Sequence, residues 1–163
     1  MFQVNLSLVS LCLAGCLLSS YAYYVEVRAE RAKQLGVVYN AYCDIGPFSC
    51  TKVFSSEYGV GARFFGLPKT SIALVGVAYY MVEMLCCWHP TLILVISAPS
   101  ILATLCLASI LVVVLRDLCL VCCLTYVVNV ATVCVAYRWW KRTAASRAAA
   151  AASSSSTESK KRG

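Results

Sequence analysis

Residues 118–137, LCLVCCLTYVVNVATVCVAY, decide the fold, and they follow directly on the charged pair Arg116-Asp117. The stretch carries no charge. At about 1.5 Å per helical residue it is long enough to cross a hydrocarbon core of about 30 Å. Cys119 and Cys122 stand at its start as a Cys-x-x-Cys pair. The stretch therefore predicts a membrane helix with two thiols at one membrane boundary.

The rest of the chain has the composition of a membrane protein. Of its 163 residues, 61% are hydrophobic and only 13% are charged, with a mean hydropathy of +0.77, whereas soluble domains average about 25% charged residues. Apolar runs at 4–25, 71–88 and 91–115 predict three more helices. We expect an all-α membrane protein, a four-transmembrane-helix bundle in one domain at 1–142, with antiparallel neighbours wherever the connections are short.

The first apolar run also has a feature of a secretory signal peptide, because Ser20-Tyr21-Ala22 resembles a cleavage site. No basic residue precedes the run, and the run is longer than the usual signal-peptide core of about 7–15 residues. We therefore expect a retained helix.

A polar segment at about 26–70 separates the first two predicted helices, and it contains a second, looser cysteine pair, Cys43 and Cys50. Between these cysteines, Asp44-Ile45-Gly46-Pro47 has strong turn chemistry. The pair can be a structural disulfide that closes a small loop, or it can exchange electrons with a neighbouring dithiol. The sequence leaves both interpretations open.

Most of the net charge of +7 lies at the C-terminus, where seven basic residues and one acidic residue follow from Arg138 onward. A basic tail after the last apolar helix is typical of a cytosolic anchor on anionic membrane lipid. It lacks the interleaved aromatic residues of a nucleic-acid site, so no nucleic-acid partner is expected. The tail at 143–163 is rich in Ala and Ser and is predicted to be disordered.

A cytosolic C-terminus and four spans place the N-terminus in the cytosol too. Arg28, Arg31 and Lys33, which follow the first apolar run, favour the reverse orientation. The cysteines decide between the two, because a cytosolic C-terminus places both pairs on the luminal, oxidising side. Lys160-Lys161 also has the form of an endoplasmic-reticulum retrieval signal. We expect an endoplasmic-reticulum membrane protein.

Cys119 and Cys122 have the spacing of a redox pair. We expect Asp117 to cap the helix and Cys119 to lie in its first turn, where the helix dipole favours a thiolate. Cys122, three residues on, shares that helix face, so the two sulfurs can form a disulfide. The alternative, zinc, needs four ligands, and the one histidine, His89, is expected at the opposite membrane face. No metal site is therefore predicted.

Glu83 interrupts the second predicted helix, where a buried carboxylate is costly. It either has a function or reaches the cytosolic interface, and the sequence does not separate these. The remaining cysteines lie in or at the ends of apolar runs, where cysteine behaves as a small hydrophobic residue. They are interpreted as packing residues: Cys12, Cys16, Cys86, Cys87, Cys106, Cys123 and Cys134.

Four motifs, in this order, resemble the vitamin K epoxide reductase family: CDIG at 43–46, CTKVFSS at 50–56, DLCLVC at 117–122 and TYVVN at 125–129. The resemblance extends from about Leu11 to Arg138. It implies a four-helix endoplasmic-reticulum enzyme, without a tightly bound cofactor, that reduces a vitamin K quinone or its epoxide. It also implies a pocket that binds coumarin anticoagulants such as warfarin.

The same resemblance implies a role for each matched residue. Cys122 attacks the substrate, and Tyr126 donates a hydrogen bond to the quinone carbonyl. Cys119 receives electrons from Cys50, and Cys43 faces a luminal thioredoxin-like thiol donor. The same couple run in reverse would generate disulfides and reduce quinone, and the sequence does not set the direction, because about 30 mV shifts a two-electron couple tenfold. A non-enzymatic four-helix protein is the third hypothesis.

The chain departs from the family at the far wall of the substrate pocket. The family places an asparagine at the luminal start of the second helix, and here Ile72 falls at that position, beside Thr70 and Ser71. Either hydroxyl can replace the asparagine as a donor, and a looser alignment would place Lys69 there instead. Phe54, Ser71 and Ile72 are the further expected substrate contacts.

Overall fold

The computed structural model describes residues 5–44, 46, 48–55 and 71–162, and it contains helices and no strand in that part of the chain. The all-α prediction is confirmed there. The elements are α1 (Leu6–Leu35), α2 (Cys50–Ser55), α4 (Ile72–Cys86), α5 (Pro90–Ser109), a π-helix (Ile110–Leu115) that continues α5, and α6 (Leu120–Arg162).

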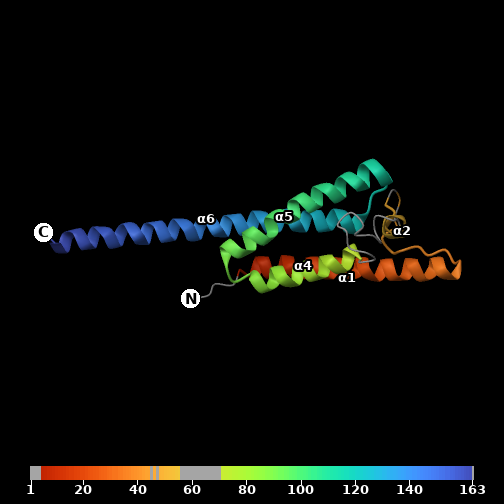
Figure 1. The fold of residues 1–163 in the computed structure, drawn as a ribbon, viewed down its shortest axis with the longest axis horizontal. Coiled ribbons are helices and arrows are strands. Elements are labelled where there is room, and N and C mark those ends of the chain that lie inside the picture. Colours follow the sequence, from red (N-terminus) through yellow and green to blue (C-terminus); the bar gives the residue numbers. More distant parts are fainter. Residues whose placement is uncertain (1–4, 45, 47, 56–70, 163) are drawn as a thin grey trace.

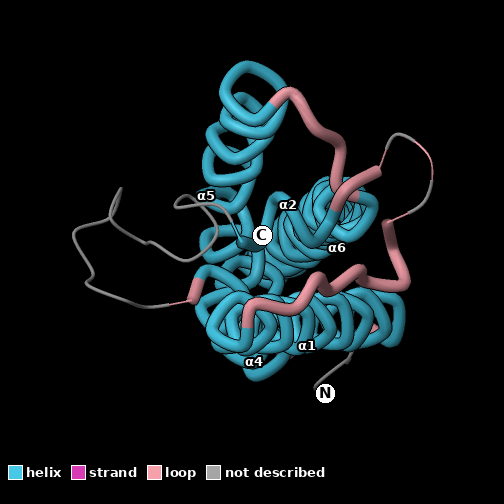
Figure 2. The backbone as a smooth tube through the Cα atoms, turned by 90° about the vertical axis from the view of Figure 1, so that its right-hand side faces the viewer, coloured by secondary structure: helices cyan, strands magenta, loops and turns pink. Residues whose placement is uncertain are grey.

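The long helices run up and down in an elongated bundle (Figure 1). α1 and α5 point toward the end where α2 lies, while α4 and α6 run away from it, so chain neighbours are antiparallel as predicted. α1 packs against α4 and α6, and α5 packs against α6. Viewed from the α2 end, α1 and α4 lie side by side and α5 leans away from them (Figure 2). Both described ends of the chain lie away from α2.

Three helical segments are long and apolar enough to cross a membrane: Leu6–Gln34, Pro90–Val113 and Leu120–Ala152. The second predicted span, at 71–88, is a shorter apolar helix of 15 residues, because Ser71 caps it and Cys87 ends it. At about 1.5 Å per residue α4 reaches about 22 Å, less than the hydrocarbon core of about 30 Å. The sequence-based prediction included those flanking residues in the helix. The length of α4 alone therefore does not establish a fourth membrane span.

The C-terminal segment differs from the sequence prediction. α6 does not end near Tyr137 but continues to Arg162 and projects beyond the bundle (Figure 1), where a disordered tail was expected. Ala144, Ala145 and the run Ala148–Ala152 explain the difference, because alanine has the highest helix propensity. This part of α6 is exposed up to Ala152, so its helicity depends on local propensity rather than on packing.

Small residues line the buried face of α1 and let α4 approach closely. A Cβ atom on Gly15 would lie 2.3 Å from the Tyr80 ring, and a Cβ atom on Gly76 would lie 2.8 Å from Ser19 Oγ. Within a membrane, helices associate through such close packing because lipid supplies no hydrophobic driving force between them. The buried positions of α1 recur every three or four residues, apart from one adjacent pair: Leu8, Cys12, Gly15, Ser19, Ala22, Val25, Glu26 and Ala29.

A polar chain across the bundle joins three helices. The Tyr80 hydroxyl on α4 donates to Asn129 Oδ1 on α6 at 2.7 Å, and Asn129 Nδ2 donates to Thr104 Oγ1 on α5 at 2.8 Å. A buried polar side chain is costly unless it is hydrogen-bonded, so these two hydrogen bonds fix the rotation of the helices about their axes. Gly15 is the position that makes room for the Tyr80 ring.

Replacing Gly15 with alanine should destabilise the bundle. The added methyl group overlaps the Tyr80 ring, and overpacking of this kind costs about 1–3 kcal/mol. We expect a lower thermal unfolding midpoint in detergent micelles for Gly15→Ala. Ser20→Ala, on an exposed position of the same helix, is the control and should leave the midpoint unchanged. Equal midpoints for both variants would contradict the close approach of α1 and α4.

Candidate redox site

Cys119 caps the start of α6 with its own sulfur. The helix begins at Leu120, the Cys119 carbonyl accepts from Cys123 N–H at 3.0 Å, and Cys119 Sγ accepts from Cys122 N–H at 3.4 Å. The prediction that Asp117 caps this helix is wrong. Asp117 instead forms an ion pair with Lys52 on α2, with Nζ and Oδ2 2.5 Å apart.

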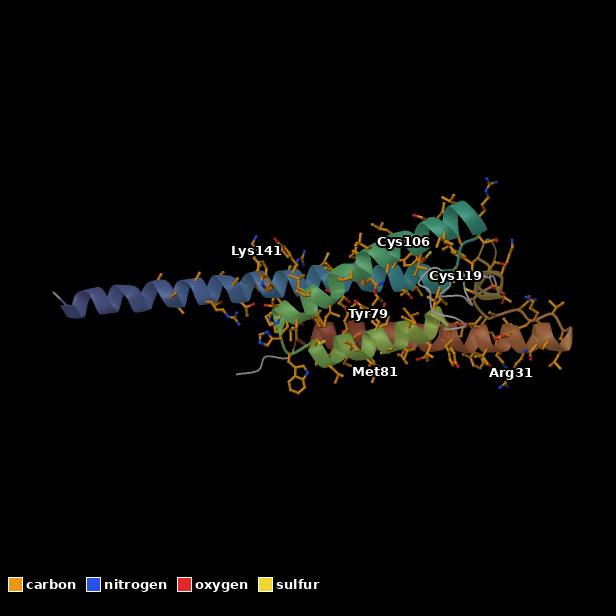
Figure 3. All side chains as sticks on the ribbon, viewed as in Figure 1. Arg31, Tyr79, Met81, Cys106, Cys119 and Lys141 are labelled. Atoms are coloured by element: carbon orange, nitrogen blue, oxygen red, sulfur yellow. The ribbon has the colours of Figure 1, made fainter. Side chains whose placement is uncertain are left out.

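α2 brings Cys50 to Cys119 at one end of the bundle, where Figure 3 places Cys119. Phe48 and Leu118 form an isolated parallel bridge, and Ser49 N–H donates to the Leu118 carbonyl at 2.8 Å. This pairing places the next residue of each segment, Cys50 and Cys119, side by side. The Sγ atoms of Cys50 and Cys119 are 3.3 Å apart, and both residues are fully buried.

The loop before α2 is held by Asp44. Asp44 Oδ2 accepts from Ala41 N–H at 3.0 Å and from the Thr51 hydroxyl at 2.5 Å, and Oδ1 accepts from Thr51 N–H at 3.0 Å. Burial would raise the pKa of the Asp44 carboxyl, but the hydrogen bonds from Thr51 and Ala41 outweigh it and hold that pKa below its usual value. Asp44 therefore stays ionised and fixes the loop that carries Cys43 and Cys50.

Cys43, Asp44 and Cys50 together have metal-ligand spacing, since their sulfur and carboxylate atoms all lie within 4.8 Å of one another. The Asp44 oxygens already accept three hydrogen bonds from the protein, so the carboxylate is committed to the loop. His89 precedes α5 at the end of the bundle opposite α2 (Figure 1), too far to add a ligand. The grouping is better described as two thiols beside a fixed carboxylate.

The thiols of Cys43, Cys50 and Cys119 have raised pKa values, which favour the protonated form at neutral pH. Burial, followed by contact with Cys50, raises the pKa of Cys43 to about 12. Contact with the Cys122 side chain, together with burial, raises the pKa of Cys119 to about 12, and contact with Cys119 and burial raise the pKa of Cys50 further. At Cys119 the neighbouring sulfur of Cys122 and burial outweigh the helix terminus, so its pKa is raised, whereas the sequence predicted a lowered one.

Cys122 and Tyr126 lie one helical turn apart on α6, and both are partly buried. They pack against the buried cluster that contains Cys119, Val121 and Ala73. Among the described residues, no partner hydrogen-bonds the Tyr126 hydroxyl. The Tyr126 side chain and Cys122 thus pack on the same buried cluster.

The start of α4 differs in detail from the expected pocket wall. Ser71 caps the helix by accepting from Leu74 N–H at 3.2 Å, and its hydroxyl donates to Glu26 on α1. Its proton is thus already engaged. Glu26 was not predicted as a site residue, although an acidic residue directly after the first apolar run was a signal. Ile72 is partly buried beside this pair.

Two other residues expected at the pocket are not described: Thr70 lies outside the described residues, as does the side chain of Phe54, whose backbone lies in α2.

Comparison with known proteins identifies relatives across the whole bundle. The sequence profile described as "Vitamin K epoxide reductase family" matches residues 6–137. The chain is 34% identical to vitamin K epoxide reductase complex subunit 1 of Rattus norvegicus, and 36% identical to the same subunit of Mus musculus. Each match extends over 146 residues, which is 80% of this chain and 86% of the relative.

Thr51→Val should expose Cys50. The variant removes a hydroxyl that both donates to Asp44 and accepts from Ala41 N–H, and each such hydrogen bond contributes about 1 kcal/mol. We expect alkylation of Cys50 in the reduced protein to become about tenfold faster, measured by mass spectrometry of the labelled peptide. Ser49→Ala is the neighbouring control. An unchanged rate would show that Thr51 does not hold α2.

The contribution of Asp44 should depend on pH in one direction. Because its folded pKa is lowered, its stabilisation is fully present above the unfolded value of about 4 and is lost as pH falls through the lower folded value. We expect the gap in unfolding midpoint between wild type and Asp44→Asn to be constant from about pH 5 to 8. The gap should narrow below about pH 4; a gap that widens on acidification would contradict the lowered pKa.

Proposed function

The chain belongs to the vitamin K epoxide reductase family, and we propose that it is a membrane thiol–disulfide oxidoreductase that reduces vitamin K epoxide, vitamin K quinone or both. The observation that carries this proposal is the 3.3 Å contact between the Cys50 and Cys119 sulfurs. It connects the loop pair to the Cys-x-x-Cys pair, which a structural loop disulfide would not require.

Electrons enter through the loop. A thioredoxin-like protein on the luminal side reduces the Cys43–Cys50 disulfide, and Cys50 then attacks Cys119 in the Cys119–Cys122 disulfide. This forms a Cys50–Cys119 mixed disulfide and releases Cys122 as a thiol. Cys43 attacks Cys50, which restores the loop disulfide and leaves Cys119 and Cys122 reduced. The protonated thiols lose their protons during these exchanges, since only a thiolate is nucleophilic.

The reduced pair then acts on the quinone. Cys122 attacks the substrate, Tyr126 donates a hydrogen bond to the oxygen on which negative charge develops, and Cys119 closes the disulfide to release the product. For the epoxide, two thiols become one disulfide, and the epoxide oxygen leaves as water. For the quinone, the same two electrons and two protons give the hydroquinone. No tightly bound cofactor is needed.

The proposed membrane placement uses α4 as a fourth span, with both termini in the cytosol and the cysteines at the luminal face of the endoplasmic reticulum. It is supported by Figure 1, in which the first and last described residues of the chain both lie on the side away from α2. The short α4 is supported by close packing on α1 at Gly15 and Gly76, and local thinning of a bilayer costs little per ångström. A coumarin such as warfarin should compete with the quinone for binding beside Cys122 and Tyr126.

A trapped intermediate tests the electron path. In the double variant Cys43→Ser, Cys122→Ser, both cysteines that could resolve the mixed disulfide are absent. Mild oxidation should therefore accumulate a Cys50–Cys119 cross-link, detected by non-reducing peptide mass spectrometry, and dithiol-dependent turnover should be lost. A further Cys50→Ser substitution is the control and should remove the cross-link. Failure to trap it, or turnover that survives in Cys122→Ala, would exclude the mechanism.

Tyr126→Phe tests the proposed hydrogen bond to the substrate. Removal of one donor to a developing oxyanion typically lowers kcat by about 100-fold or more. We expect that loss in assays with epoxide and with quinone, with unfolding midpoint unchanged. Tyr137→Phe, at an exposed position farther along α6, is the control. Running the same assays in reverse, with quinone and a reduced protein thiol, establishes the direction of electron flow.

A further inference from the structure

A second pair of cysteines lies in contact at the other end of the bundle. Cys12 on α1 and Cys87 at the C-terminus of α4 have Sγ atoms 3.8 Å apart, and their exposed fractions are 0% and 1%. Cys87 is the C-cap of α4, and the C-terminal end of α4 lies away from α2 and from Cys119 (Figures 1 and 3). Both were predicted to be packing residues, and nothing in the proposed electron path uses them.

A buried carboxylate accompanies this pair. Cys12 Sγ donates to Glu83 Oε2 at 3.8 Å, while Glu83 Oε1 accepts from the Tyr79 hydroxyl at 2.7 Å. Glu83 is 1% exposed, which rules out the alternative that it reaches the interface. Cys87 Sγ donates to the backbone carbonyl of Glu83 at 3.3 Å. Glu83 Oε2 is thus the oxygen that faces the Cys12 thiol.

We propose that Cys12 and Cys87 form a redox-sensitive disulfide that cross-links α1 to α4, with a hydroperoxide as the oxidant. Glu83 accepts the proton of Cys12, and the thiolate attacks the peroxide, breaking the O–O bond. Cys12 becomes a sulfenic acid, and the leaving oxygen takes the proton from Glu83. The Cys87 thiol then attacks the Cys12 sulfur and displaces water. Two thiols and one hydroperoxide give one disulfide, one alcohol (water, from hydrogen peroxide) and one water.

The packing favours this bond. The sulfurs must move from 3.8 Å to the covalent separation of about 2.05 Å. Cys87 ends its helix and is followed by a turn, so its backbone is not fixed by helical hydrogen bonds on its C-terminal side. The two helices are also in close contact elsewhere, where Gly15 on α1 lies against Tyr80 and Gly76 on α4 lies against Ser19. The cross-link would fix the two helices in the separation that they already have.

Hydrogen peroxide tests this proposal on the full-length, fully reduced protein in lipid nanodiscs. Peptide mass spectrometry of the alkylated, unreduced protein should recover a Cys12–Cys87 linked peptide. Its formation should be about tenfold slower in Glu83→Gln, and the unfolding midpoint of the oxidised protein should rise by several degrees. Cys87→Ser should abolish the linked peptide, whereas Cys86→Ser, which changes the adjacent cysteine, should leave it.

The wild-type peptide map decides the question even if a variant fails to fold. Cys12 and Cys87 that are both still alkylated after peroxide and denaturation would overturn the proposal. So would a Cys12–Cys16 link in place of the Cys12–Cys87 link. The loop cysteines and Cys119 lie at the opposite end of the bundle. A protein without quinone turnover would therefore still show whether Cys12 and Cys87 form the disulfide.

Discussion

The close approach of α1 and α4 is the constraint on which the rest of the structure depends. The Tyr80 ring occupies the space that a side chain on Gly15 would fill, and the Tyr80 hydroxyl is hydrogen-bonded to Asn129 on α6. Lipid tails supply no hydrophobic driving force for helix association, so helix contact at this distance requires small residues and hydrogen-bonded polar groups. The same helix pair brings Ser71 to Glu26 at one end and Cys87 to Cys12 at the other.

The redox site is assembled by a different principle, because its parts lie at helix ends and in a loop. A short backbone pairing between Ser49 and Leu118 sets two chain segments side by side, and Asp44 holds the loop through hydrogen bonds from Thr51 and Ala41. These contacts outweigh the Lys52–Asp117 ion pair, whose lysine is 67% exposed and which therefore contributes about 1 kcal/mol or less. Neutral backbone contacts and one fixed carboxylate thus hold the segments that carry Cys50 and Cys119.

The sequence predicted the chemistry of the site better than its geometry. Cys43, Cys50, Cys119 and Cys122 were identifiable because polar residues and turn signals surround them in the chain. The contact of Cys12 with Cys87 was not identifiable, since it depends on how two helices separated by many residues are rotated against each other. Helix ends were also misjudged: composition does not distinguish a residue that caps α4, such as Ser71, from one inside it.

The unbroken length of α6 separates the basic residues near Arg138 from those at its C-terminal end. At about 1.5 Å per residue its 43 residues extend about 65 Å, roughly twice the hydrocarbon thickness. If α6 crosses the bilayer from Leu120, then Arg138, Lys141 and Arg142 stand at headgroup level. The backbone of Lys160 lies about 27 Å farther along the axis, several times the screening length of about 8 Å at physiological salt. On that placement the first group can bind lipid headgroups, while the backbone at Lys160 lies beyond the reach of headgroup charge.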